Sequence, residues 1–366
     1  MTNLNKLAES IIISLQQYIN TLGYRPVVHF ELEGCYQKRN NISVDYNNVN
    51  QSLSKLGIDG EVVAEYWSNQ WEYVSLFNGQ SPLKEAQNLH NAIHILPKLF
   101  ARQGVDNTLI KPVVWAGDTG KLASGCNNIF SLDKRAVHIP NAVQINVSLQ
   151  DKNNSNVLTS GDFAERLQEN FMATSLPCCL LYLPEEDAFE RLALKTKYGL
   201  AAELCSPVDI SGGHQGSVAL YRDIGKHNQK MGVEPILYDD KNNVLLSRDN
   251  WHKTARIEHR LGASSERYNP FLNVIYALLN IIDTLDDVKP QLSAKSTQLP
   301  ASLYDKSDCF GAIALFAGDS WFSQTIDRTL AQQIGYSSTQ QVSEISDGQL
   351  LKQYYLKQFQ QADIII

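Results

Sequence analysis

The chain has 366 residues, of which 43% are hydrophobic, and a formal net charge of −7. This length and composition are typical of a globular protein with one large domain or two moderate ones. The negative charge, with no cluster of Lys and Arg, argues against nucleic acid or an anionic membrane as the main partner. Its apolar runs are too short to span a bilayer, and we expect no signal peptide.

The cysteines point to a reducing compartment. Six are present, none in a Cys-x-x-Cys spacing, and Cys178 and Cys179 are adjacent. This pattern is not typical of a zinc site or of a disulfide framework. We therefore expect free thiols in a cytoplasmic protein.

The N-terminal region predicts a helix followed by an acidic strand. Apolar residues from Leu4 to Leu22 follow helical spacing, and Gly23 is typical of the position just after a helix. Residues 27–33 alternate, which places Glu31 and Glu33 on one face of a strand. Taken alone, such acids are typical of the solvent face of a half-buried strand.

Further along, residues 65–72 carry Glu65 and Glu72 at the ends of a Glu-x4-Gln-x-Glu pattern. Residues 82–102 have helical spacing, and Pro97 should kink or split that helix. The glycine-containing segment 115–140 is typical of loops.

Residues 141–149 alternate again and predict a strand with Gln144, Asn146 and Ser148 on one face. A helix interrupted near Pro177 is predicted for residues 167–183. A largely apolar helix is expected from Asn273 onward.

The segment 254–261 predicts a strand that places Arg256, Glu258 and Arg260 on one face. Two guanidinium groups beside one carboxylate can neutralise it or bind an anion. For an isolated pattern of this kind, a structural ion pair on the surface is the ordinary alternative.

These segments together resemble glutamine synthetase. The family carries R-x-E-x-R followed by N-P-[YF]-L, which this chain matches at residues 256–260 and 269–272. Partial matches are E-x-E at 31–33, the frame of 65–72, Ser-Leu at 148–149 and Phe-x-Arg-Leu at 189–192. The resemblance implies an α+β fold in which a curved, mainly antiparallel sheet forms a funnel flanked by helices. Residues 1–26 would be a helix in place of the family's N-terminal beta-grasp domain, and residues 27–366 the catalytic domain.

The resemblance also implies a site for ATP and two Mg²⁺ or Mn²⁺ ions. Glu33, Glu65 and Glu72 would bind one ion, and Glu31, Gln144 and Glu258 the other. Converging carboxylates repel one another by about 4 kcal/mol per pair at ~4 Å and an effective dielectric of 20, which independently favours cations with oxygen ligands.

The remaining roles come from the same resemblance. The nucleotide would contact Asn146, Ser148, Arg222 and Arg256. Arg256 and Arg260 would stabilise the transferred phosphoryl group, and Arg191 would bind the carboxylate of the substrate.

The chain departs from the family at several of these positions. Gln144 and Asn146 stand where the family has histidines, Gly216 stands in place of an arginine, and Lys197 stands in place of a flap glutamate. A carboxamide oxygen binds Mg²⁺ but is a weaker ligand than imidazole for Mn²⁺.

Two functions follow as hypotheses. One is an ATP-dependent carboxylate–amine ligase that uses an acid or amine other than glutamate and ammonia. The other is a catalytically inactive relative that binds nucleotide, a ligand or a protein partner. By analogy with the family, a homo-oligomer is expected.

Overall fold

The computed structural model describes residues 3–37, 43–67, 69–115, 138–198, 206–209, 216–225, 231, 237–238, 240–241, 244–245, 251–289, 298–306, 309–334 and 345–360. The predicted loops between residues 116 and 137 and the proposed flap position Lys197 lie outside the described residues or side chains. Among the described residues, no helix combines the length and the apolar character needed to cross a membrane.

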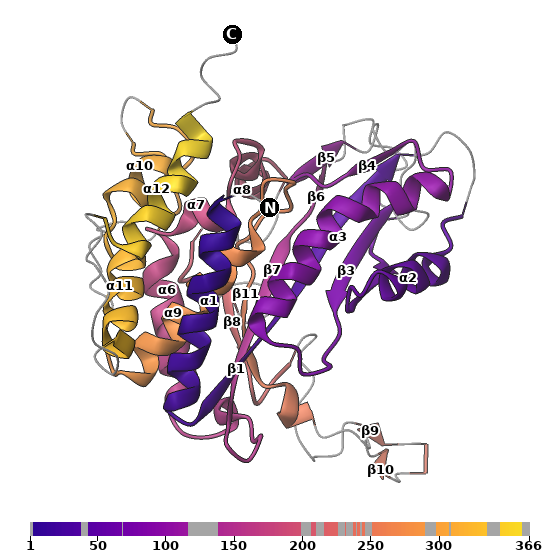
Figure 1. The fold of residues 1–366 in the computed structure, drawn as a ribbon. Helices are drawn as coiled ribbons and strands as arrows, with labels where there is room; N and C mark the ends of the chain where they lie inside the picture. The colour runs from indigo at the N-terminus through magenta and orange to yellow at the C-terminus, as the bar shows by residue number, and fades with distance from the viewer. Residues whose placement is uncertain are drawn as a thin grey trace.

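The strands form one large sheet and two small ladders (Figure 1). Their bounds are β1 Tyr24–Gln37, β2 Gly60–Ala64, β3 Gln70–Ser75, β4 Asn107–Leu109, β5 Val113–Trp115, β6 His138–Pro140, β7 Val143–Asp151, β8 Val218–Tyr221, β9 Leu237–Tyr238, β10 Val244–Leu245 and β11 Arg256–His259. Within the described residues, seven strands make the large sheet in the order β2-β3-β1-β7-β11-β8, with β4 paired to β1. Its pairings are antiparallel, as predicted, and the sheet is open rather than closed on itself.

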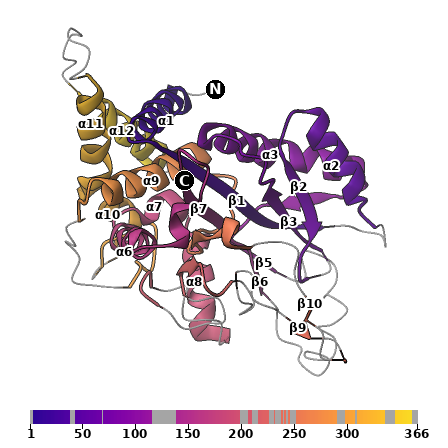
Figure 2. The ribbon, with the colours of Figure 1, turned by 90° about the horizontal axis from the view of Figure 1, so that it is seen from below.

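The helices pack around this sheet (Figures 1 and 2). Their bounds are α1 Asn3–Thr21, α2 Tyr46–Lys55, α3 Pro82–Arg102, α6 Phe163–Ser175, α7 Cys179–Tyr182, α8 Asp187–Tyr198, α9 Pro270–Leu285, α10 Ala312–Gly318, α11 Trp321–Ile334 and α12 Asp347–Gln360. Two short 3₁₀ helices are Val157–Thr159 and Trp251–Thr254. Helices α1, α3 and α9 contact one another and β1.

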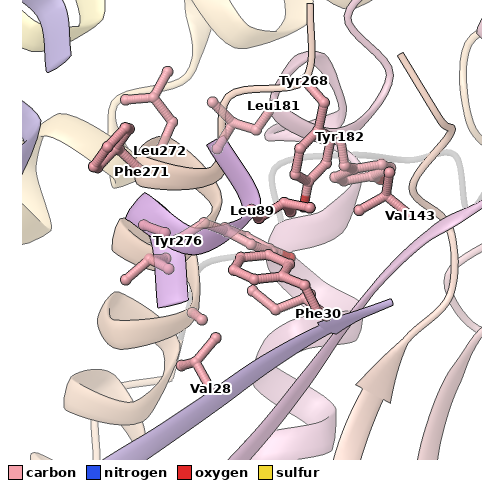
Figure 3. Packing of buried hydrophobic residues seen from close by; sticks show 14 of the residues in the cluster. Val28, Phe30, Leu89, Val143, Leu181, Tyr182, Tyr268, Phe271, Leu272 and Tyr276 are labelled. Carbon is pink, nitrogen blue, oxygen red and sulfur yellow. The ribbon is translucent and has the colours of Figure 1, made fainter. Parts of the chain in front are cut away.

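The core lies between these helices and one face of the sheet. Val28 and Phe30 of β1 belong to the same buried cluster as Leu89 of α3 and Tyr276 of α9 (Figure 3). Period-2 alternation sends these β1 side chains to the helical side and leaves the polar residues for the opposite face. The site therefore forms on the face of the sheet that α1, α3 and α9 do not cover.

Helix α9 runs through the centre of the core. Asn269 caps it, because its side-chain oxygen accepts hydrogen bonds from the N–H groups of Phe271 and Leu272 at 3.1 and 3.2 Å. Every residue from 270 to 284 is buried, because α1, α3, α6 and α11 contact the helix. This confirms the predicted buried helix.

The other helices follow the sequence closely, with one exception. Helix α1 ends before Gly23, whose φ is +86°, as the C-cap pattern predicts. The break near Pro177 separates α6 from α7. Pro97 does not split α3, which is continuous from Pro82 to Arg102, so the expectation of a split was wrong, while a kink stays a prediction.

Candidate functional site

The predicted polar residues gather on one face of the central strands. Residues directly opposite each other in an antiparallel pair place their side chains on the same face. The opposed pairs are Glu33 with Glu72, Glu31 with Gln144, and Asn146 with Glu258. Strands β3, β1, β7 and β11 thus bring together residues that are far apart in sequence.

The R-x-E-x-R strand forms a compact charged group. Glu258 is fully buried, and its Oε2 accepts a hydrogen bond of 3.0 Å from Arg256, while Arg260 Nε lies 3.5 Å from its Oε1. Arg256 also donates to Asn146 Oδ1 at 2.7 Å, and its guanidinium lies 4.7 Å from the ring centre of Tyr221. The ion pair and the aromatic contact fix the direction of the Arg256 side chain.

The amide of Gln144 lies between two carboxylates. The amide forms hydrogen bonds with the carboxylates only when its nitrogen faces them. The nitrogen then donates to Glu31 Oε2 at 3.2 Å and to Glu258 Oε1 at 2.8 Å. The other oxygens of the two carboxylates accept from Asn146, at 3.0 Å, and from Arg256, at 3.0 Å. Glu31 therefore presents Oε2 to Gln144, and Glu258 presents Oε1, which it shares with Arg260.

This group has the chemistry that Mg²⁺ prefers. Neighbouring oxygens around an octahedral Mg²⁺ lie about 2.9 Å apart, given metal–oxygen distances of ~2.05 Å. The amide end of Gln144 lies 2.8 and 3.2 Å from the two carboxylate oxygens. With the amide oxygen turned toward the carboxylates, Glu31, Gln144 and Glu258 offer hard oxygen ligands of the kind that a divalent cation such as Mg²⁺ prefers, although Glu258 Oε1 also lies 3.5 Å from Arg260 Nε.

The acids of the other predicted metal set are less closely gathered. The pKa of Glu33 is raised to about 7, mainly by burial and also by the charges of Glu65 and Glu31, although the N–H of Ala142 and the charge of Arg191 act in the opposite direction. Glu72 lies beside Glu33 in the register of β1 and β3. Such mutual repulsion is relieved by a cation. Among the described residues, however, no three or more His, Cys, Asp or Glu side chains form a ready metal site.

Three further predicted residues lie in different surroundings. Arg191 is buried on α8 and donates to the carbonyl of Leu261 at 3.4 Å. Ser148 lies on the same face of β7 as Gln144 and is half-buried. Arg222 follows β8 and forms a 2.7 Å ion pair with Glu165 of α6, so the structure does not bring it to the polar face. The roles of all three stay predictions.

Two aromatic rings beside the site, His29 and Phe77, were given no role in the analysis of the sequence. His29 shares the face of Glu31 and stacks on Phe77, with 4.0 Å between ring centres. Burial, together with the charge of Arg256, lowers the pKa of His29 to about 4, so the imidazole is neutral at pH 7. Phe77 is 63% exposed. The alternation of β1 pointed to His29, but no pattern marked Phe77, which follows β3.

Comparison with known proteins rests on structure alone. No family model matches the sequence, and no curated protein matches it. Many solved structures match the fold, and three of them illustrate the likeness over most of the chain. A "novel glutamine synthase homolog" has a TM-score of 0.55 at 15% identity, over 95% of this chain and 74% of that one. A "GmaS/ADP complex" has 0.58 at 11% identity, over 97% and 74%, and "Apo GmaS without ligand" has 0.55 at 12%, over 92% and 75%.

The fold is that of glutamine synthetase homologues. The likeness confirms the predicted architecture, and it extends across both the acidic strands and the helices behind them. Within this glutamine synthetase-type fold, the polar face of β3, β1, β7 and β11 is the place where the chain concentrates its charged and hydrogen-bonding side chains.

Proposed function

We propose that the protein is an ATP- and Mg²⁺- or Mn²⁺-dependent ligase that joins a carboxylate to an amine. The observation that carries the proposal is the group formed by Arg256, Glu258 and Arg260 beside the acids of β1 and β3. The glutamine synthetase-type fold and a similar structure described as an ADP complex support nucleotide binding here. We further propose that the acid or amine differs from glutamate or ammonia, because Gln144 and Asn146 stand at the centre of the site.

The reaction has two steps. A carboxylate oxygen of the substrate attacks the γ-phosphorus of ATP, so that an acyl phosphate forms and ADP leaves. The amine then attacks the carbonyl carbon, loses a proton and expels inorganic phosphate. A bound divalent cation would neutralise phosphate charge.

The chain's own residues contribute position and charge. Arg256 is held by Glu258, Asn146 and Tyr221, and such pre-set guanidinium groups stabilise charge on the transferred phosphoryl group without moving. The positive charge of Arg191 acts on Glu33, and the carboxylate of a substrate is a matching partner for such a guanidinium group. The aromatic pair of His29 and Phe77 offers an apolar surface beside Arg256.

The direct test is ADP release with Mg²⁺ and a panel of carboxylates and amines. At least one pair should give ADP release that requires both substrates, and Arg260→Ala should abolish it. Arg166→Ala is the control, because Arg166 forms ion pairs with Asp162 and Asp287 on the other side of the sheet. No turnover with any pair would refute the ligase.

An inactive nucleotide-binding protein is the second candidate. It is favoured by the fact that Arg256 donates hydrogen bonds to Asn146 and Glu258 within the protein, which leaves fewer of its donors for a phosphoryl group. Retained ADP binding without turnover would support it. Formation of a homo-oligomer, a cytoplasmic location, and residues 1–26 as a separate N-terminal unit also stay predictions; α1 itself belongs to the main core.

A further inference from the structure

A buried carboxyl group joins helix α3 to the first strands of the sheet. Glu85 of α3 is fully buried, and its Oε2 accepts a hydrogen bond of 2.7 Å from the hydroxyl of Ser75, the last residue of β3. The same hydroxyl accepts a hydrogen bond of 3.0 Å from the N–H of Phe30 in β1. The pairing of β1 with β3 ends at Glu31 and Val74, so these two hydrogen bonds extend the ladder by one step and tie its end to α3.

Further polar atoms are buried in the same layer. Among the described residues, no hydrogen bond is formed by Glu85 Oε1, by the amide of Asn88 or by the hydroxyl of Tyr73. A buried carboxylate oxygen without a donor disfavours the ionised form, because the charge loses hydration and gains nothing in return. A neutral carboxyl group, in contrast, has an O–H that can donate. The geometry therefore suits a Glu85 side chain that carries a proton.

Tyr73 and Asn88 lie toward the same side of α3. A Cβ at Gly60 of β2 would overlap the ring of Tyr73, so this ring lies against β2. Asn88 follows Lys84 by one helical turn, and Lys84 donates to the carbonyl of Gly57, in the turn before β2, at 2.6 Å. A protonated carboxyl group on α3 thus has a phenol and an amide as acceptors on the side of β2.

The charges around Glu85 act in opposite directions. Within the described part of the chain, the charged and titratable groups that face it are Asp59, Lys84 and Tyr73. The pKa of Glu85 is raised to about 7, mainly by burial and also by the charge of Asp59, although the hydrogen bond from Ser75 and the charge of Lys84 act in the opposite direction. The folded chain therefore keeps a proton on Glu85 at pH values where the unfolded chain has released it.

We propose that Glu85 is a proton-operated latch: as a neutral acid it ties α3 to the end of the β1–β3 ladder, and release of its proton to solvent loosens this joint. A charged Glu85 is buried near Asp59 with one oxygen unpaired, and separation of the start of α3 from the end of β3 lets water reach the carboxylate. The joint adjoins the polar face, because Phe30 directly precedes Glu31, but it does not depend on the proposed ligase.

The first test is urea unfolding of the full chain at pH 5 and pH 8, without metal or nucleotide. Glu85→Gln keeps the shape and a hydrogen-bond donor but has no proton to release. Folded Glu85 titrates near pH 7 and an unfolded glutamate near pH 4.5, so the unfolding equilibrium constant of the wild type should rise about 70-fold relative to that of Glu85→Gln over this range. A constant ratio would overturn the proposal.

Glu9→Gln is the matched control. Glu9 of α1 is half-buried and also contacts α3, because it accepts a hydrogen bond of 3.1 Å from Gln87. Its substitution should change the ratio far less than Glu85→Gln does. Equal changes in the two variants would show that the pH dependence does not come from the latch.

A local measurement separates a latch from a group that titrates without moving anything. Hydrogen exchange of the Phe30 amide, corrected for the intrinsic effect of pH, reports the hydrogen bond to Ser75. Its protection should fall about five- to tenfold from pH 6 to pH 8 in the wild type and stay constant in Glu85→Gln. Unchanged protection in the wild type would overturn the latch.

A surface variant keeps the proposal testable if Glu85→Gln does not fold. The side chain of Asp59 is 38% exposed, so Asp59→Asn leaves the core intact and removes the negative charge that acts on Glu85. The fall in Phe30 protection should then occur at lower pH than in the wild type. A fall at the same pH would mean that a group other than Glu85 loosens the joint.

Discussion

Removal of the Glu258 charge is the sharpest test of the charged group. Glu258→Gln is nearly isosteric, but its NH₂ group must face a donor, because both carboxylate oxygens accept hydrogen bonds or ion pairs from arginine. Glu258 is fully buried, and the side chains of Arg256 and Arg260 are only 16% and 12% exposed. Breaking a buried ion pair by removing one partner costs ~3–5 kcal/mol. Allowing for the partial exposure of both arginines, we expect a loss of about 3 kcal/mol.

The assay is urea unfolding followed by circular dichroism, in the absence of metal and nucleotide. Glu165→Gln is the matched control, because Glu165 also pairs with an arginine, Arg222, at 2.7 Å, but its side chain is 43% exposed. Exposed pairs contribute roughly 0.2–1 kcal/mol, so the control should lose far less. Equal losses in the two variants would refute the view that Glu258 is the buried counter-charge of the site.

Three further changes test the sheet and the core. Burial lowers the pKa of His259 to about 3, so below pH 6.5 this residue takes up a proton in the unfolded chain that it does not take up in the folded chain. Its own contribution makes unfolding about 2 kcal/mol easier from pH 7.5 to pH 5, so the difference in unfolding free energy between the wild type and His259→Gln should change by about 2 kcal/mol over this range, and a constant difference would contradict the buried neutral imidazole. A Cβ at Gly34 would lie 2.4 Å from the Trp71 ring, so Gly34→Ala should cost ~1–3 kcal/mol in urea unfolding, and Trp71→Leu should relieve that cost; additive losses would contradict the contact. Asn269→Ala removes the cap of α9 and should lower the melting temperature by the equivalent of about 1 kcal/mol, and an unchanged melting temperature would mean that the cap is not needed.

The sequence was most informative about local structure and about the faces of strands. Helical spacing located α1, α3 and α9, because an apolar stripe must face a core whatever the topology. Alternation correctly separated Arg256 and Glu258 from Ile257 and His259, because successive side chains of a strand point to opposite faces.

The sequence could not show which strands become neighbours. The order β3-β1-β7-β11 and the opposition of Glu31 to Gln144 depend on long-range pairing, which no local pattern encodes. Likewise, the sequence did not predict the ion pair of Arg222 with Glu165, because this pair joins the residue after β8 to helix α6, which is distant in sequence. The predicted split at Pro97 was wrong for a related reason. Tertiary packing along α3 outweighs the tendency of proline to break a helix.

The arrangement of α1 has a consequence for synthesis. This helix packs on α9, α11 and α12, and Gln333 donates to the carbonyl of Ser14 across 319 residues. Helix α1 is translated long before α9, α11 and α12. Its apolar stripe therefore has no packing partners from these helices until they have been synthesised. Contacts of such long sequence separation slow folding and prolong exposure to chaperones and to aggregation. The polar face is built from neighbouring strands, but the helical layer behind it is complete only when α11 and α12 have been synthesised.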